Sequence, residues 1–111
     1  MVEELSPEAV KERIEAGDTQ VVDIRPFEQF EQGHIPGAVN IPMSQLPASV
    51  AEVEWGDDVV CACPVGQSSV QAAKLIQSFE EVDDDATVAS MAGGYREWEY
   101  ELESGETSDA Q

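Results

Sequence analysis

The chain has 111 residues, which is the size of one domain. Hydrophobic residues make up 41% of it, enough for one packed core. No segment approaches the roughly 20 consecutive apolar residues of a membrane-spanning helix. There are 24 Asp and Glu residues against 5 Lys and Arg, so the formal net charge is -19. A field of that sign repels nucleic acid and disfavours anionic membranes, so we expect neither as a partner.

The N-terminal residues and the charge balance bear on where the protein works. Residues 1–5, Met-Val-Glu-Glu-Leu, lack the basic and apolar regions of a secretory signal, so we expect a cytoplasmic location. So much acid with so little lysine favours a halophilic protein, because self-repulsion is screened where the Debye length falls to about 3 Å at 1 M salt. An ordinary acidic protein is the alternative.

The first part of the chain predicts a helix, a strand and a helical turn. Ser6 can cap a helix that Pro7 opens, and Gly17 suits its C-terminal end. Residues 20–24, Gln-Val-Val-Asp-Ile, predict a mostly buried strand. Residues 26–33, which run from a proline to a glycine, predict a short helical turn.

Turn-forming residues follow, and they leave room for one strand and one helical piece. Residues 38–41, Ala-Val-Asn-Ile, predict a short strand. Ser44 or Ser49 can cap a helical piece that reaches towards Glu54, although Pro47 interrupts its pattern.

An apolar strand and a helix are predicted in the second half of the chain. Residues 59–62, Val-Val-Cys-Ala, predict the strand. It runs into a loop over residues 63–67, because the proline and glycine there break either regular structure. Ser68 or Ser69 can cap a helix that continues to about Phe79.

The remaining elements complete an alternating pattern. Residues 87–89 predict a strand, and residues 93–102 predict a Gly-Gly turn and a last helix. Strands thus alternate with helices, which predicts an α/β fold: one domain over residues 1–103, with a largely parallel central sheet flanked by helices. Residues 104–111 predict a flexible acidic C-terminal tail.

Cys63 follows the mid-chain strand, at the sheet edge where α/β proteins place their active sites. Backbone N–H groups of the loop can form an anion-binding nest, and the dipole of the next helix adds partial positive charge. Both stabilise a thiolate and lower its pKa. Gly66 permits the backbone angles of such a curl, and Pro64 stiffens it. Ser68 and Ser69 can donate hydroxyl hydrogen bonds and cap the helix together.

Other interpretations of the two cysteines stay open. Cys63 can be a small buried hydrophobe, as free cysteine often is. Cys61 lies two residues upstream on the same side of the strand, which fits inert packing, a resolving thiol or a strained disulfide with Cys63. Two thiols and one histidine do not make a persuasive zinc set, so we expect no metal.

Five segments together are similar to one family. They are VVDIR at 21–25, FEQF at 27–30, GHIPGAVNIP at 33–42, VVCACPVGQSS at 59–69 and GGYREW at 93–98. In this order and spacing they resemble a single-domain rhodanese, a member of the sulfurtransferase superfamily. The resemblance extends over residues 5–102 and implies a rhodanese-like α/β domain.

The resemblance also implies a site and a chemistry. Cys63 becomes the sulfur-carrying nucleophile, with no metal or organic cofactor needed. The loop from Cys63 to Ser68 has six residues, typical of sulfur-transferring members. Related dual-specificity phosphatases have a longer loop ending in arginine, and this chain has neither feature, which counts against a phosphatase. The implied substrate-binding or anion-binding loop is Pro64, Val65, Gly66, Gln67, Ser68 and Ser69.

The chain departs from the family inside this loop. Many active members carry a basic residue there, commonly where Ser68 stands, whereas here the loop has no charge. A hydrogen bond to a charged group is worth about 1.5–3 kcal/mol, against about 1 kcal/mol for a neutral one. We therefore expect weak thiosulfate binding, which makes a protein persulfide the alternative donor.

Three further residues of the resembling segments are expected to support the site. The resemblance implies that Asp23 and Arg25 tie the sheet to adjacent loops, with a contact between Arg25 and substrate as the alternative. It implies that His34, the only histidine, is a packed and hydrogen-bonded side chain. A general-base role for His34 is the other interpretation.

The sequence therefore favours a sulfurtransferase that works through a Cys63 persulfide. It would move sulfane sulfur from thiosulfate or a persulfide donor to a thiol, cyanide or a protein acceptor. The expected partners are a small sulfur donor or persulfide-carrying protein and a sulfur-acceptor protein. Two alternatives remain: a catalytically weak rhodanese-fold binding or regulatory module, which the uncharged loop favours, and a redox sensor using Cys61 and Cys63.

Overall fold

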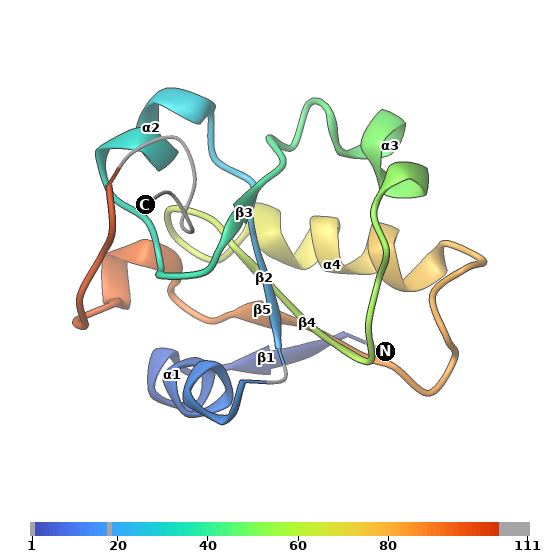
Figure 1. The fold of residues 1–111 in the computed structure, drawn as a ribbon, viewed down its shortest axis with the longest axis horizontal. Helices are drawn as coiled ribbons and strands as arrows, with labels where there is room; N and C mark the ends of the chain where they lie inside the picture. Colours follow the sequence, from blue (N-terminus) through green and yellow to red (C-terminus); the bar gives the residue numbers. More distant parts are fainter. Residues whose placement is uncertain (1, 18, 105–111) are drawn as a thin grey trace.

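The computed structural model describes residues 2–17 and 19–104 (Figure 1). A five-stranded sheet lies at its centre in the order β1-β5-β4-β2-β3, and neighbouring strands are parallel. The α/β fold with a parallel central sheet is therefore confirmed. The strands are β1 (Glu3–Leu5), β2 (Gln20–Asp23), β3 (Val39–Asn40), β4 (Asp58–Ala62) and β5 (Thr87–Met91).

Helices cover both faces of this sheet (Figure 1). On one face, Val10 and Phe30 from two helices pack in a cluster with Val60 of β4. On the other face, Ile76 packs in a cluster with Val59. The helices are α1 (Pro7–Ala16), α2 (Phe27–Gln32), α3 (Leu46–Ser49) and α4 (Ser68–Ser78), with two 3-10 helices, η1 (Val50–Glu52) and η2 (Gly94–Glu97).

Strand β4 positions the cysteines. It lies between β2 and β5 and is apolar over 59–62, because helices cover it on both faces. Successive side chains of a strand point to opposite faces. Cys61 and Cys63 accordingly belong to the cluster on the α4 side, whereas Val60 and Ala62 belong to the other cluster.

The predicted start and end of the first helix are confirmed. The Ser6 hydroxyl accepts a hydrogen bond from the Ala9 N–H at 3.1 Å, and Pro7 occupies the first turn. Gly17 ends α1 with a left-handed φ of 86°, and its N–H bonds to the Arg13 and Ile14 carbonyls. Local capping chemistry is therefore enough to define this helix.

The helical piece in mid-chain is built differently from the prediction. Helix α3 begins after Gln45, and neither Ser44 nor Ser49 caps it with a side chain. Pro47 does not interrupt the helix, because it lies in the first turn, where no backbone N–H is needed for an intrahelical bond. A 3-10 turn, η1, then ends the piece at Glu52.

The predicted last helix is wrong in length, because only η2 forms. Trp98 is already extended, with φ -78° and ψ 116°. The chain then turns back, and Glu103 pairs with His34 in an isolated antiparallel bridge with two N–O distances of 2.8 Å. The spacing of Tyr95 and Trp98 indicated a helix, but both side chains reach the same core cluster from a chain that does not continue helically.

One strand was not predicted at all. Strand β1 pairs with β5 at the edge of the sheet, with Glu4 opposite Ser90 and Leu5 opposite Met91. Its first two side chains, both glutamates, are exposed, so it lacks the apolar run that marked the other strands. An edge strand needs only one protected side, which explains the weak sequence pattern.

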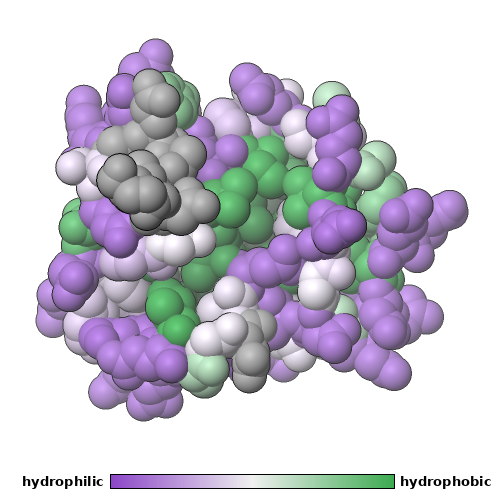
Figure 2. Space-filling view, viewed as in Figure 1, coloured by the Kyte–Doolittle hydropathy of each residue, from purple (hydrophilic) through white to green (hydrophobic). Residues whose placement is uncertain are grey.

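The surface is mainly hydrophilic, with an apolar strip between β3 and α3 on the face seen in Figure 2. No helix within the described ranges is long and apolar enough to cross a membrane. Of the predicted tail over residues 104–111, Ser104 alone is described, and the rest lies outside the described residues.

Candidate active site

The Cys63 sulfur lies inside a curl of backbone directly after β4. The residue is only 1% exposed. The N–H of Gly66 donates to Sγ at 3.0 Å, and the N–H of Ser69 does so at 3.3 Å. The Ser69 hydroxyl lies 3.3 Å from the same sulfur. The loop therefore surrounds one sulfur atom with hydrogen-bond donors, as a thiolate requires.

A buried chain of hydroxyl groups continues from the sulfur into the sheet. Ser69 Oγ lies 2.6 Å from Ser90 Oγ of β5, and both residues are 0% exposed. The prediction that Ser68 or Ser69 caps α4 is wrong, because both residues lie inside the helix and the Ser69 hydroxyl is used in this chain of contacts. The residue before the helix is Gln67, which makes no side-chain cap bond. Sequence reasoning missed Ser90, since nothing in its local sequence marks it.

The two cysteines have opposite acid–base properties. Burial opposes ionisation of Cys63, but hydrogen bonds from the Ser69 hydroxyl and from the amides of Ser69, Gly66 and Val65 lower the pKa of the thiol. Burial, followed by the charge of Cys63, raises the pKa of Cys61 to about 12. The thiolate, which is the nucleophilic form, therefore forms more readily on Cys63 than on Cys61.

The strand geometry also separates the two thiols. Cys61 lies within β4 and is 0% exposed. Residues two apart in a strand are about 6.5 Å apart, whereas disulfide Cβ atoms lie about 3.5–4.5 Å apart. A Cys61–Cys63 disulfide would thus require the end of the strand to bend. Both cysteines are free in the structure.

Two glycines let the loop after Cys63 and the η2 turn pack backbone to backbone. Gly66 has a φ of 88°, and a Cβ there would lie 2.7 Å from the Gly93 nitrogen. Gly94 has a φ of 61°, and a Cβ there would overlap the Cys63 carbonyl oxygen. The Tyr95 N–H donates to that same carbonyl at 2.8 Å. The turn therefore fixes the shape of the loop.

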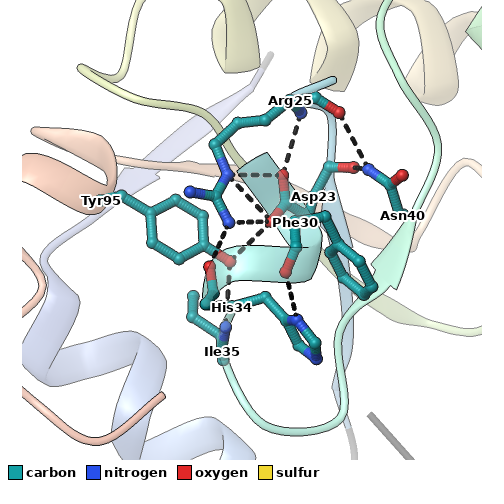
Figure 3. A network of polar contacts seen from close by, with 8 residues as sticks. Asp23, Arg25, Phe30, His34, Ile35, Asn40 and Tyr95 are labelled. Atoms are coloured by element: carbon teal, nitrogen blue, oxygen red, sulfur yellow. Dashed lines mark hydrogen bonds and ion pairs between the residues drawn. The ribbon is translucent and has the colours of Figure 1, made fainter. Parts of the chain in front are cut away.

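Asp23 and Arg25 form a buried network at the end of β2 (Figure 3). The guanidinium of Arg25 donates to both carboxylate oxygens of Asp23 and, at 2.6 Å, to the Gly33 carbonyl. The Tyr95 hydroxyl donates to Asp23 at 2.9 Å and accepts from the Ile35 N–H at 3.0 Å. Arg25 also lies over the Tyr95 ring, 3.6 Å from its centroid.

This network joins three parts of the chain to Asp23 in the sheet: Arg25 after β2, the segment of Gly33 and Ile35, and Tyr95 of η2. Asp23 is 0% exposed, so its charge needs the partners that Arg25 and Tyr95 supply. Burial, and then the charge of Asp23, raises the pKa of the Tyr95 phenol above its ordinary range. Arg25 points into the network, which fits the tying role implied by the resemblance.

His34 is buried in a packed position. Its ring stacks on Phe30, with centroids 3.7 Å apart and an interplanar angle of 4°. Its Nδ1 lies 2.7 Å from the Phe30 carbonyl oxygen, a contact that requires the proton on Nδ1. The packing leaves His34 at 0% exposure, with its ring against Phe30 and its backbone paired with Glu103. This geometry fits the packed side chain better than a general base.

The loop residues divide into an inner and an outer set. Ser69 is buried against the sulfur, and Gly66 is half-buried. The outer set, whose side chains face solvent, is Pro64, Val65, Gln67 and Ser68. Within the described part of the chain, no group of three or more His, Cys, Asp or Glu side chains could hold a metal ion.

The chain is similar to known rhodanese-like and sulfurtransferase proteins in sequence and in structure. The family model described as "Rhodanese-like domain" matches residues 6–101. "Sulfurtransferase" of Allochromatium vinosum is 31% identical over 99 residues, which cover 88% of this chain and 89% of that protein. The human single-domain sulfurtransferase TSTD1 superposes with a TM-score of 0.73 at 27% identity, covering 88% of this chain and 96% of that one.

Some relatives are considerably longer than this chain. "HTH-type transcriptional regulator Rv0324" of Mycobacterium tuberculosis is 36% identical over 86 residues, which cover 78% of this chain but 37% of that protein. Another curated relative is covered over 51% of its length. The chain thus spans about a third to a half of these two relatives.

Proposed function

Because the chain belongs to the rhodanese-like domain family, we propose that it is a sulfurtransferase working through a persulfide on Cys63. The observation that carries the proposal is the set of donors around Sγ: two backbone amides and one hydroxyl at 3.0–3.3 Å. These donors stabilise a thiolate before the reaction and a persulfide anion after it. A purely structural buried cysteine needs no such surroundings.

The reaction proposed has two half-reactions. The Cys63 thiolate attacks the outer sulfur of thiosulfate or of a persulfide, the bond to the donor breaks, and sulfite or a thiolate leaves with the electron pair. The outer sulfur of the resulting persulfide is then attacked by an acceptor thiol or cyanide, which releases the Cys63 thiolate. Sulfur moves without net oxidation of the protein, and no cofactor takes part in the steps.

The electrostatics favour a persulfide donor over thiosulfate. The loop from Cys63 to Ser69 carries no charged side chain, so a thiosulfate dianion would rely on amides and hydroxyls alone. Arg25 is already paired with the buried Asp23 carboxylate. The net charge of -19 repels a free dianion further wherever salt does not screen it.

Intact mass spectrometry in high salt tests the proposal. The protein is incubated with thiosulfate or with a persulfide donor, beside the variants Cys63→Ser and Cys61→Ser. We expect a gain of one sulfur that cyanide removes, that Cys61→Ser retains and that Cys63→Ser loses. If neither donor loads Cys63, the sulfurtransferase proposal fails and a rhodanese-fold binding module becomes the better account, as the uncharged loop already suggests.

A further inference from the structure

Two neighbouring hollows, which share Met43 in their linings, lie beside the loop that follows Cys63. One hollow of about 400 Å³ is lined by Met43, Gln67, Ser68 and Gln71, so it touches the outer side of the loop. A second hollow of about 450 Å³ shares Met43 with the first. It lies between the start of α2 and the segment joining β3 to α3. We call the two together the Met43 groove.

The second hollow is mainly apolar. Its lining includes Pro26, Phe27, Pro42 and Met43. Phe27 is 41% exposed, although it is a large aromatic side chain at the first position of α2. The segment that carries Pro42 and Met43 joins β3 to α3, where Figure 2 shows the apolar strip. Apolar surface gathered beside a reactive thiol favours contact with another molecule over contact with water.

The groove contains one charged residue, which is acidic. Among the residues described, Glu28 is the only charged side chain that lines either hollow, and no lysine or arginine does. An anionic occupant would therefore find no counter-charge here. An apolar side chain next to a basic one would complement both Phe27 and Glu28.

From this we infer that the Met43 groove binds an extended peptide segment of a partner protein, whose cysteine exchanges sulfur with Cys63. The segment carries an apolar side chain, which lies between Phe27 and Met43, and a basic side chain, which faces Glu28. This inference rests on the proposed function, since it names the class of molecule that reaches the same sulfur. Gln67 and Ser68 belong both to the loop after Cys63 and to the lining of the first hollow, so they connect the groove with the loop.

The transfer at this surface balances without another reactant. The thiolate of the peptide cysteine attacks the outer sulfur of the Cys63 persulfide. A bond forms between these two sulfurs, the bond between the outer sulfur and Cys63 Sγ breaks, and Cys63 leaves as a thiolate. The peptide then holds the persulfide, and the proton of its thiol passes to solvent.

Short acceptor peptides test the inference directly. Cys63 is loaded with sulfur, and transfer is followed by mass spectrometry to Ac-Lys-Leu-Cys-Gly-NH2, Ac-Lys-Ser-Cys-Gly-NH2 and Ac-Glu-Leu-Cys-Gly-NH2. We expect the first peptide to react with a kcat/KM about tenfold above that of the second, because a buried leucine contributes that much. The third should be slower than the first, and Glu28→Gln should remove that difference. Equal rates for all three peptides would overturn the inference.

Variants in the groove provide the matched comparison. Phe27→Ser and Met43→Gln should each lower the ratio of peptide transfer to cyanide transfer about tenfold. Val39→Ser removes an apolar side chain that is 58% exposed and outside the groove, so its ratio should equal that of the unaltered protein. A fall of the same size in all three variants would contradict docking in this groove.

A binding measurement separates this inference from the proposed function. The non-reactive peptide Ac-Lys-Leu-Ser-Gly-NH2 is titrated against the isotope-labelled protein and followed by NMR. We expect shifts confined to residues 24–28, 42–45 and 67–71 even if Cys63 never loads sulfur. If Cys63 loads sulfur but these shifts are absent, the sulfurtransferase proposal stands and peptide binding in the Met43 groove is ruled out. If the shifts appear but Cys63 never loads sulfur, the groove remains a peptide-binding site, but of a non-catalytic module.

Discussion

Cys61 and Cys63 lie two residues apart, yet the structure gives them different chemistry. Both side chains lie on the α4 side of the sheet and both are almost fully buried. The difference lies in their donors: Cys63 accepts hydrogen bonds from Gly66 and Ser69. Cys61 is surrounded by apolar side chains in the middle of β4. Burial alone raises the pKa of a thiol, so the donors explain why the pKa of Cys63 is lowered while that of Cys61 is raised.

The pH dependence of alkylation tests the hydroxyl chain behind Cys63. Iodoacetamide should react with Cys63 with a pH midpoint below that of an ordinary thiol, since its pKa is lowered. Ser69→Ala removes a direct hydrogen bond to the thiolate, worth about 1.5–3 kcal/mol, and should raise the midpoint by about one to two pH units. Ser90→Ala should raise it less, because Ser90 acts through Ser69.

Ser68→Ala is the matched control for these two variants. The Ser68 side chain is exposed, and the adjacent Ser69 makes the contacts with the sulfur. Its alkylation midpoint should therefore equal that of the unaltered protein. Equal midpoints for all four proteins would show that the hydroxyl chain does not tune the thiol.

Cys61 makes a separate prediction at alkaline pH. Its pKa is about 12 in the folded protein, whereas the unfolded chain has an ordinary thiol pKa. Between the two values the unfolded state has lost the proton and the folded state has not. The neutral Cys61 thiol therefore makes its full contribution to the free energy of unfolding below the unfolded-state pKa. This contribution is lost as the pH rises towards 12, by about 1.4 kcal/mol per pH unit.

Urea unfolding from pH 8 to pH 11 measures this effect. Cys61→Val fills a similar volume and does not ionise, so its stability should fall less steeply above pH 9 than that of the unaltered protein. The comparison cancels the effect of Tyr95, whose pKa is also raised. Parallel stability curves for the two proteins would contradict a neutral, buried Cys61.

At the scale of elements, the shape of the loop after Cys63 depends on a turn some thirty residues further along the chain. Gly94→Ala would place a Cβ against the Cys63 carbonyl oxygen and 2.7 Å from the Gly66 nitrogen, at a φ of 61°. We expect a loss of more than about 2 kcal/mol in unfolding free energy and a slower alkylation of Cys63, because the loop must move.

Gly37→Ala separates backbone strain from this collision. Gly37 has a similar φ of 85°, but a Cβ there would meet nothing within 4 Å. It should lose only about 1–2 kcal/mol and leave the reactivity of Cys63 unchanged. Thermal unfolding and the rate of Cys63 alkylation are measured for both variants. If Gly37→Ala slowed alkylation as much as Gly94→Ala, the close contact between Gly94 and the Cys63 carbonyl would not be what shapes the loop.

The same distinction explains what the sequence alone could predict. The start of α1, the apolar run of β4 and the loop after Cys63 depend on neighbouring residues, so local patterns predicted them. Ser90 contacts Ser69, and Gly94 packs against the Cys63 carbonyl. These contacts join residues far apart in the sequence, and no local pattern encodes them. The sequence predicted a turn at Gly93 and Gly94, but it did not predict that this turn packs against the loop after Cys63.

The predicted last helix failed for a related reason. The spacing of Tyr95 and Trp98 suits a helix, yet tertiary contacts override it, since the Tyr95 hydroxyl reaches Asp23. The chain then leaves helical geometry so that Glu103 can pair with His34. A pattern of apolar residues identifies the side chains that are buried, but here it did not identify the backbone that carries them.

At the scale of the whole molecule, charge is the dominant property. The chain carries 24 acidic and 5 basic residues, and several of the basic ones are already engaged. Lys11 pairs with Glu15, Arg13 with Asp58, and Arg25 with Asp23. Most carboxylates of the described residues therefore face solvent outside these ion pairs, and they repel one another more in the compact state than in the unfolded chain.

This repulsion predicts that salt stabilises the fold. Raising KCl from 0.1 M to 2 M should increase the unfolding free energy by about 1–2 kcal/mol and the melting temperature by roughly 5–10 °C. A variant with Glu80→Gln, Glu81→Gln, Asp84→Asn and Asp85→Asn removes four exposed carboxylates from one loop. Its response to KCl should be smaller, because less repulsion remains to be screened. Equal stability of the unaltered protein at both concentrations would remove the argument for a protein adapted to high salt. If KCl raised the unfolding free energy of the unaltered protein and of the four-residue variant equally, the effect would come from the general strengthening of apolar burial by salt.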